Sequence, residues 1–241
     1  VRPHVRLSAG MTRSIVWPTV GLWSASTPGG DVILLLGPEP ALRWRMFSEQ
    51  VMTVANKFEA SMLLTLGALL ADVPHSRPVQ LMGTATEQTM IDRFDLQRSR
   101  YEGPTGIVGV LHDAAAQTDL ASASLWAAVP AYASQVPSPK AALALVERAC
   151  EMLGCPASTA RLVTEAGEYD ARVSAFVGDD DDLISYVSRL ESLADSGALD
   201  DDDEDDDEGE GNEPIDDTRL NSDELMAEVE RFLRDQGDNS S

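Results

Sequence analysis

The sequence predicts an α/β fold built on a mostly parallel, doubly wound β-sheet. Three continuous apolar runs, at residues 31–36, 61–66 and 122–129, have the pattern of strands that are buried on both faces of a sheet. A glycine or a proline ends each run, and segments with helical spacing of their apolar residues come between and after the runs. Strands and helices that alternate in this way are typical of a parallel sheet, because two parallel neighbours need a crossover connection.

The N-terminal part is predicted to form a hairpin, a core strand and a helix. Two short β-prone runs, at residues 4–7 and 14–20, flank a turn that contains Gly10. The core strand 31–36 follows, and apolar residues then recur at helical spacing over residues 42–58.

The middle of the chain continues the alternation. A polar loop at residues 72–83 separates the strand 61–66 from a short helix at 87–94. A longer helix at 106–117 then leads to the strand 122–129.

Three helices are predicted after the last core strand. The first spans residues 138–153, with Ser138 as its N-cap and Pro139 at its first position. Two amphipathic stretches, at 158–177 and 183–194, follow it and are expected to form a small helical appendage. The acidic run at 179–182 between them is expected to start the second of these helices, because the helix dipole favours negative charge there.

The acidic charge of the chain belongs to its C-terminal tail. Residues 1–178 hold 16 acidic and 14 basic side chains, whereas residues 179–217 hold 19 acidic side chains and one basic side chain. We therefore predict four regions: an α/β domain at 1–155, a helical appendage at 156–195, a disordered acidic linker at 196–220 and an amphipathic helix at 221–236.

Composition limits the compartment and the partners. A net charge of −23 without a basic patch disfavours nucleic-acid binding. No apolar run reaches the ~20 residues that a membrane-spanning helix needs, and the N-terminus lacks a signal-peptide pattern. The two cysteines, Cys150 and Cys155, are too few for a disulfide framework, so we expect free thiols. The sequence therefore predicts a cytoplasmic protein that binds neither nucleic acid nor membrane.

Polar residues gather in loops after the core strands, where open α/β sheets bind ligands. Structural roles compete with ligand binding for some of them. Glu39 and Arg43 have the spacing of an ion pair or a helix cap, and a loop histidine such as His75 is more often exposed or hydrogen-bonded than catalytic. The candidate ligand-binding or partner-binding residues are Glu39, Arg43, Asp72, His75, Arg77, Tyr101, Glu102, Thr105, Tyr132 and Lys140.

Sequence motifs for catalysis, metals and cofactors are missing. The chain contains neither G-x-S-x-G nor a phosphate-binding glycine loop, and its three histidines do not have the spacing of metal ligands. We therefore predict no catalytic, cofactor-binding or metal-binding residue, and the sequence favours a protein that is not an enzyme.

Four loop segments together resemble the proteasome assembly chaperone 2 family, in its actinobacterial branch. They begin at residues 37, 65, 99 and 124, and they read GPEPALRWR, TLGALLADVPHSRP, SRYEGPTGIVG and SLWAAVPAY, the last with PSPK at 137–140. The resemblance extends over residues 2–190 and the C-terminal helix. It implies a three-layer α/β domain similar to nucleoside phosphorylases, a helical C-terminal part, a homo-oligomer such as a trimer, and a proteasome-related protein partner.

The chain departs from the family pattern at both ends. Members usually begin with a further strand and helix, which we expect this chain to lack. Relatives that bind the proteasome can end in a hydrophobic–Tyr–any tripeptide, whereas this chain ends in Asn239-Ser240-Ser241.

Two classes of function follow. The first is a non-catalytic, assembly-chaperone-like interaction protein. The alternative is a small-ligand-binding protein, or an enzyme of nucleoside phosphorylase-like or carboxylate–amine ligase type, with its site in the strand-end cleft. A third use, in which the acidic run mimics nucleic acid or screens a basic partner, is less favoured because such runs are usually solvated.

Overall fold

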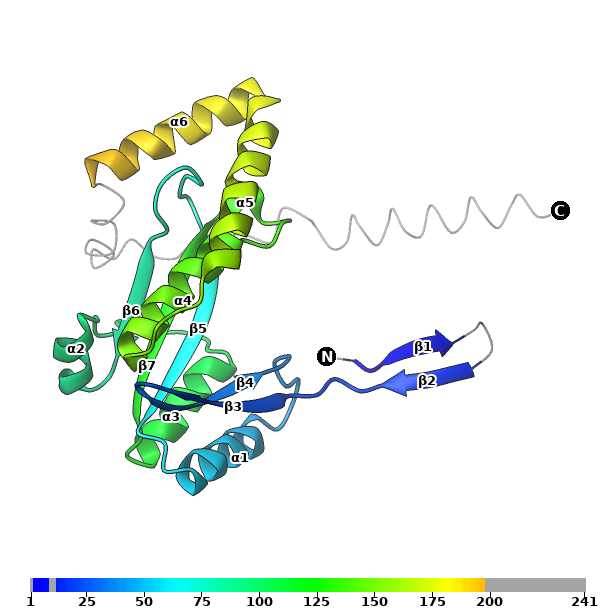
Figure 1. The fold of residues 1–241 in the computed structure, drawn as a ribbon, viewed down its shortest axis with the longest axis vertical. Helices are drawn as coiled ribbons and strands as arrows, with labels where there is room; N and C mark the ends of the chain where they lie inside the picture. The colour runs from blue at the N-terminus through cyan, green and yellow to red at the C-terminus, as the bar shows by residue number, and fades with distance from the viewer. Residues whose placement is uncertain (1, 9–11, 198–241) are drawn as a thin grey trace, which may run out of the picture. The chain divides into compact units, whose positions relative to one another are not determined.

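The computed structural model describes residues 2–8 and 12–197, which belong to one compact unit (Figure 1). Its central sheet has three strands in the order β5-β7-β6. The strands are β5 (Met62–Ala71), β6 (Leu81–Ala85) and β7 (Ala121–Pro130). β5 runs parallel to β7, and β6 pairs antiparallel with the other edge of β7.

Two antiparallel ribbons precede the central sheet in the chain. β1 (His4–Ser8) pairs with β2 (Thr12–Val16), and β3 (Gly21–Thr27) pairs with β4 (Gly30–Leu36). We refer to these two hairpins as the apolar ribbons, because most of their large side chains are hydrophobic and exposed.

Six α-helices and one short 3-10 helix complete the described part. They are α1 (Trp44–Lys57), α2 (Gln88–Phe94), α3 (Ile107–Gln117), the 3-10 helix (Ala131–Ala133), α4 (Pro139–Leu153), α5 (Ala160–Gly178) and α6 (Asp181–Ser196).

β7 is the centre of the core, and successive side chains of a strand point to opposite faces. Leu125 and its neighbours at odd positions pack with α4 and α2. Ser124 faces the other way and accepts a hydrogen bond from Thr65 Oγ1 at 2.9 Å. Thr65 Oγ1 also lies 2.9 Å from His112 Nε2 on α3. Burial lowers the pKa of His112, so the neutral form of its ring is favoured.

The caps of α4 and α6 confirm the helix starts that the sequence indicated. Ser138 Oγ accepts a hydrogen bond from the Ala141 N–H at 3.2 Å, and proline occupies the first helical position. The Asp180 carboxylate accepts hydrogen bonds from the N–H groups of Asp182 and Leu183, at 2.9 and 3.1 Å. Acidic side chains at this end also interact favourably with the helix dipole.

The α/β class is confirmed, but the mostly parallel sheet is not found among the described strands. Among the described strands, β5 and β7 are the only parallel pair, and residues 31–36 belong to the antiparallel ribbon β3–β4 instead of the core sheet. Two strands were not predicted: β3, and β6, which begins within the expected polar loop and continues past its end. The likeness to nucleoside phosphorylases stays a prediction.

Gly67 does not end β5 as its sequence context suggested. A Cβ atom at Gly67 would lie 2.6 Å from the Trp126 ring of the neighbouring strand, so the glycine makes room for that ring. β5 therefore continues to Ala71.

The predicted C-terminal helix at 221–236 and nearly all of the predicted acidic linker lie outside the described residues. The four-region division stays a prediction. Within residues 2–8 and 12–197, no helix is long and apolar enough to cross a membrane.

Candidate functional site: the polar cluster at the strand ends

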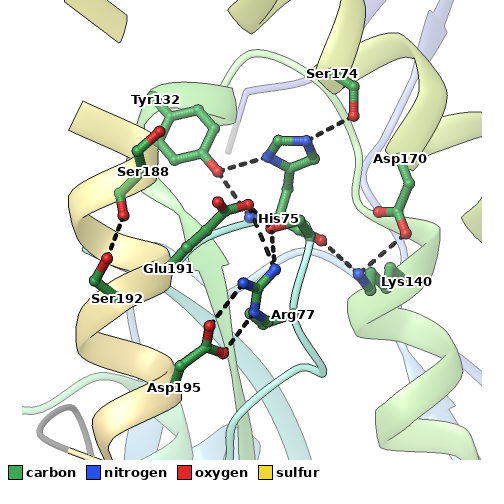
Figure 2. A network of polar contacts seen from close by, with 11 residues as sticks. His75, Arg77, Tyr132, Lys140, Asp170, Ser174, Ser188, Glu191, Ser192 and Asp195 are labelled. Carbon is green, nitrogen blue, oxygen red and sulfur yellow. Dashed lines mark hydrogen bonds and ion pairs between the residues drawn. The ribbon is translucent and has the colours of Figure 1, made fainter. Parts of the chain in front are cut away.

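Five of the ten predicted residues come together beyond the carboxyl ends of β5 and β7. The register pairs Ala71 with Pro130, so the two loops that follow these residues start side by side. Helices α5 and α6 contribute further polar side chains (Figure 2). We call the whole set the polar cluster: Asp72, His75, Arg77, Tyr132 and Lys140 with Tyr169, Asp170, Ser174, Tyr186, Glu191 and Asp195.

His75 is at the centre of the polar cluster and is 5% exposed. Its backbone N–H donates to the Tyr132 hydroxyl at 2.7 Å, and its Nδ1 lies 2.8 Å from the same oxygen. The hydroxyl can also donate its own proton to Nδ1, and in that tautomer Nε2 carries the ring proton. Nε2 lies 2.9 Å from Ser174 Oγ. Burial lowers the pKa of His75, with nearby Asp170 opposing the effect, and the neutral ring is favoured.

Lys140 fixes the same loop from α4. Its Nζ donates to the carbonyl oxygen of His75 and forms an ion pair with Asp170 at 3.0 Å. The second carboxylate oxygen of Asp170 and the hydroxyl of Tyr169 are buried without hydrogen-bond partners, although Ser138 lies near that hydroxyl. A cavity of about 10 Å³ borders His75, Lys140 and Tyr169 and has room for about one water molecule.

Arg77 joins the loop to α6. Its guanidinium donates to both carboxylate oxygens of Asp195, at 2.7 and 2.8 Å, and lies 3.5 Å from Glu191. Ser76 Oγ also donates to Glu191. The hydrogen bond from Arg77 lowers the pKa of Asp195. Since these groups are exposed, salt screens the pair and it contributes little to stability.

Two tyrosines, Tyr132 and Tyr186, link the loop after β7 to α6 and to Asp72. Tyr132 and Tyr186 meet edge to face with ring centroids 6.2 Å apart, and the Tyr186 hydroxyl donates to Asp72 at 2.7 Å. Burial raises the pKa of Tyr132 to about 12, so its phenol remains protonated at neutral pH.

The other five predicted residues do not join the polar cluster through any hydrogen bond or ion pair of the described residues. Glu39 Oε1 instead accepts from the N–H of Ile107 at 2.9 Å, which caps α3 from a distant loop. The ion pair expected between Glu39 and Arg43 is not among the ion pairs of the described residues. Arg43 precedes α1 with a φ of 60°.

The turn at residues 101–106, after the short helix α2, is stabilised by contacts among its own residues and with the start of α3. The Tyr101 hydroxyl donates to the carbonyl oxygen of Pro104 at 2.8 Å. Thr105 packs against Gly109, where a Cβ atom would lie 2.0 Å from the threonine hydroxyl. Glu102 is exposed. These contacts give Tyr101 and Thr105 roles within the turn.

The cluster residues that the sequence did not single out come from α5 and α6. Asp170 and Ser174 are four positions apart on α5, and Glu191 and Asp195 are four positions apart on α6. This spacing puts each pair on one helix face. The spacing is visible in the sequence, but nothing in it identifies the loop that each face meets.

The polar cluster is arranged as a clamp. Both ring nitrogens of His75 have partners, Lys140 is paired with Asp170, and Arg77 is paired with α6. The geometry therefore fixes the strand-end loops.

Comparison with known proteins places the chain in a family. A model of the PAC2 family matches residues 1–177. A PAC2 family protein from Streptomyces avermitilis MA is 38% identical, with a TM-score of 0.69, and the match covers 77% of this chain and 79% of that chain. A proteasome-assembly chaperone homologue from Mycobacterium tuberculosis is also 38% identical, with a TM-score of 0.69 and coverage of 77% and 80%.

More distant structures share the fold alone. Pyrococcus furiosus PbaA, an archaeal homolog of proteasome-assembly chaperone, is 17% identical with a TM-score of 0.51, and the match covers 71% of this chain and 73% of that chain. No curated protein matches the chain. The family match includes both ribbons, the central sheet and the loops of the polar cluster. The chain belongs to the PAC2 family.

Proposed function

We infer that the chain is a non-catalytic, chaperone-like interaction protein that self-assembles and binds a proteasome-related protein. Its family includes a proteasome-assembly chaperone homologue at 38% identity, which supports a chaperone-like role. The polar cluster supports the non-catalytic part, since His75, Lys140 and Arg77 each contact polar side chains of α5 or α6.

The ribbon β3–β4 carries the proposal of self-assembly, because hydrophobic side chains are exposed on both of its faces. Trp23 and Leu34 are opposite each other on one face, and Leu22 and Leu35 are opposite each other on the other face. All four are exposed, Leu34 to 56%. A two-stranded ribbon in water is marginally stable unless something packs against it. We therefore expect another protein surface to cover this ribbon.

The ribbon β1–β2 and the edge of β5 show the same feature. Val5 pairs with Ile15, and both side chains are exposed. β5 has β7 as its one neighbour among the described strands, and its residues Leu66 and Leu70 are exposed. An edge strand with exposed hydrophobic residues is a surface on which another chain can add.

A second copy of this chain is the occupant that fits the ribbons best. Interfaces between permanently associated copies are large and hydrophobic, and a ribbon with two hydrophobic faces needs a permanent cover. Residues 1–178 are nearly neutral, with 16 acidic and 14 basic side chains, so two copies of this part repel each other little.

Sedimentation of the full chain tests self-assembly. We expect a mass that is a multiple of 25.9 kDa and a mass near one chain for Leu34→Glu. Val163→Glu is the matched control, because Val163 on α5 is hydrophobic and 53% exposed but is not in a ribbon. A monomeric wild type, or equal dissociation of both variants, would contradict the proposal.

Binding of purified proteasome subunits from the host organism to the immobilised full chain tests the proposed partner. We expect a proteasome subunit to be retained, at a dissociation constant of about 10 µM or tighter. Retention of no subunit at that concentration would rule out this partner and leave self-assembly untouched.

The small-ligand alternative is not favoured by the strand-end loops. Their cavity of about 10 Å³ is far smaller than the several hundred Å³ typical of ligand pockets. A thermal-shift screen with nucleosides, nucleotides and phosphate separates the two proposals. A rise in melting temperature with any of them would support the alternative.

A further inference from the structure

The C-terminus of α4 ends in a Schellman motif. The Cys155 N–H donates to the carbonyl oxygen of Cys150 at 2.9 Å, and the Gly154 N–H donates to that of Glu151 at 3.1 Å. Gly154 has a φ of 64°, in the left-handed region that this motif requires and that glycine adopts without strain. The chain therefore turns back sharply over the last turn of the helix.

This motif brings together the side chains of its first and last residues. A contact between two hydrophobic residues frequently accompanies the motif at these positions. Here both positions are cysteines, Cys150 and Cys155, and the two thiols are free and half-buried. Burial, and then the neighbouring Cys155 thiol, raises the pKa of the Cys150 thiol. The backbone hydrogen bonds of the motif thus bring the two cysteines into one turn, and no other cysteine exists in the chain.

The turn of the ribbon β3–β4 lies against the same helix end. A Cβ atom at Gly29 would lie 2.1 Å from the carbonyl oxygen of Leu153 and 2.8 Å from that of Gly154. Only a glycine allows so close an approach of the two backbones. The helix end that carries the thiols is therefore packed on one side, which limits the conformations that the two cysteines can adopt.

We propose that Cys150 and Cys155 form a reversible dithiol–disulfide site that small-molecule disulfides oxidise. The inference does not depend on the proposed function. A disulfide between these residues closes a short ring around Gly154 and cross-links the end of α4 to the segment that leads into α5.

The reaction takes place in two exchange steps. The Cys155 thiolate attacks a small-molecule disulfide, breaks its S–S bond and releases one thiol, which leaves a mixed disulfide on Cys155. Cys150 then loses its proton to solvent, and its sulfur attacks the Cys155 sulfur and releases the second thiol. One small-molecule disulfide is reduced to two thiols, and two protein thiols are oxidised to one disulfide. Cys155 reacts first because the raised pKa of Cys150 keeps that thiol protonated.

Intact-mass measurement of the full chain in glutathione redox buffers tests the proposal. After acid quenching and alkylation, we expect the wild type to convert from a doubly alkylated species to an unalkylated species that has lost two hydrogen atoms. Cys150→Ser and Cys155→Ser should instead accumulate one glutathione each, since the second exchange step is missing.

The position of the thiols is tested by comparing the folded chain with the chain in urea. Because the motif brings the two cysteines into one turn, we expect the effective concentration of their thiols to be at least about tenfold higher in the folded chain. Gly154→Ala, checked for its fold by circular dichroism, should lower this value because alanine disfavours the left-handed conformation.

Three outcomes would overturn the proposal. They are stable glutathione adducts on the wild type, an effective concentration that is unchanged by urea, and disulfide-linked dimers that form before the internal disulfide.

Discussion

The polar cluster and the apolar ribbons differ in how fully the chain satisfies its own side chains. His75 is 5% exposed, and each of its ring nitrogens has a hydrogen-bond partner. Leu36, at the end of β4, is 70% exposed, and its ribbon has no third strand among the described residues. The loops that looked functional because they are polar are fixed from within the chain. The hydrophobic run at residues 31–36, which was predicted to be a core strand, lies instead in an exposed ribbon.

This difference gives a rule for interpreting the molecule. Polar residues beyond the ends of β5 and β7 do not by themselves indicate a reaction, because ion pairs and hydrogen bonds can use all of their groups. Hydrophobic residues on both faces of a ribbon call for a partner surface. The four predictions below test the rule, beginning with the largest expected loss of stability.

Among the polar residues, replacement of His75 should have the largest effect. In His75→Ala, the hydroxyls of Tyr132 and Ser174 lose their partner and a cavity replaces a buried ring, so the free energy of unfolding should fall by about 2–4 kcal/mol. Urea unfolding followed by circular dichroism measures it. The control is His4→Ala, because His4 is exposed on β1 and should lose less than about 0.5 kcal/mol. Equal losses in the two variants would show that the polar cluster is not a clamp.

Loss of the α4 cap should have the next largest effect. Ser138→Ala removes the acceptor for the Ala141 N–H at the helix start, which typically costs about 1 kcal/mol. Ser134→Ala, in the exposed turn before α4, is the matched control and should leave the urea midpoint unchanged. A smaller loss of stability for Ser138→Ala than for its control would show that this cap does not stabilise α4.

Acidification should destabilise the fold through its buried histidines. Burial lowers the pKa of His75 and His112 below the ordinary value of 6.5, so the unfolded chain binds more protons than the folded chain below that pH. The stability from these rings is fully present above pH 6.5 and is lost as the pH falls through their lowered pKa values. The Arg77–Asp195 pair contributes in a lower range, because the pKa of Asp195 is lowered from 3.8.

Urea midpoints between about pH 7.5 and 5.5 measure this dependence. The slope of stability against pH should be smaller in His75→Gln and smaller still when His112→Asn is added. A slope that is identical in the wild type and the double variant would exclude the two histidines as its cause.

Substitution in a ribbon should have the smallest effect on the stability of a single chain. Leu36→Thr changes a side chain that is 70% exposed, so the free energy of unfolding of the dissociated chain should change by less than about 0.5 kcal/mol. The comparison is with Leu125→Ala on β7, where the side chain is 1% exposed and a loss of about 2–5 kcal/mol is expected. A loss of similar size in both variants would mean that the ribbon belongs to the core.

The helices could be predicted because their signals are local. The periodic apolar residues of α1 and α3, the serine–proline start of α4 and the acidic start of α6 act within one or two turns. β6 could not be predicted in this way, since Leu-Met-Gly-Thr-Ala becomes a strand through its pairing with β7, more than 35 residues further along the chain. Gly67 was interpreted as a stop because the ring of Trp126 that it accommodates lies on another strand.

The polar cluster was predictable to the same limited extent. The rule that parallel strands end together was enough to bring Asp72, His75 and Tyr132 to one place. It could not bring in Ser174 or Asp195, because their helices reach the loop through tertiary packing. Sequence spacing gives the face of a helix, and the loop opposite that face is fixed only by the complete fold.

Because its residues are far apart in the sequence, the polar cluster can be completed only late in synthesis. His75 and Ser174 are 99 residues apart in the chain, and Arg77 and Asp195 are 118 residues apart. At ribosomal rates of about 10 residues per second, the loop waits roughly ten seconds for its partners to appear. During that interval His75 and Arg77 are solvated, and the loop that follows β5 lacks its contacts with α5 and α6. The contacts of Asp195 therefore form last and complete the fixing of the strand-end loops. A chain that ends before residue 195 should leave the ribosome with these loops accessible to proteases.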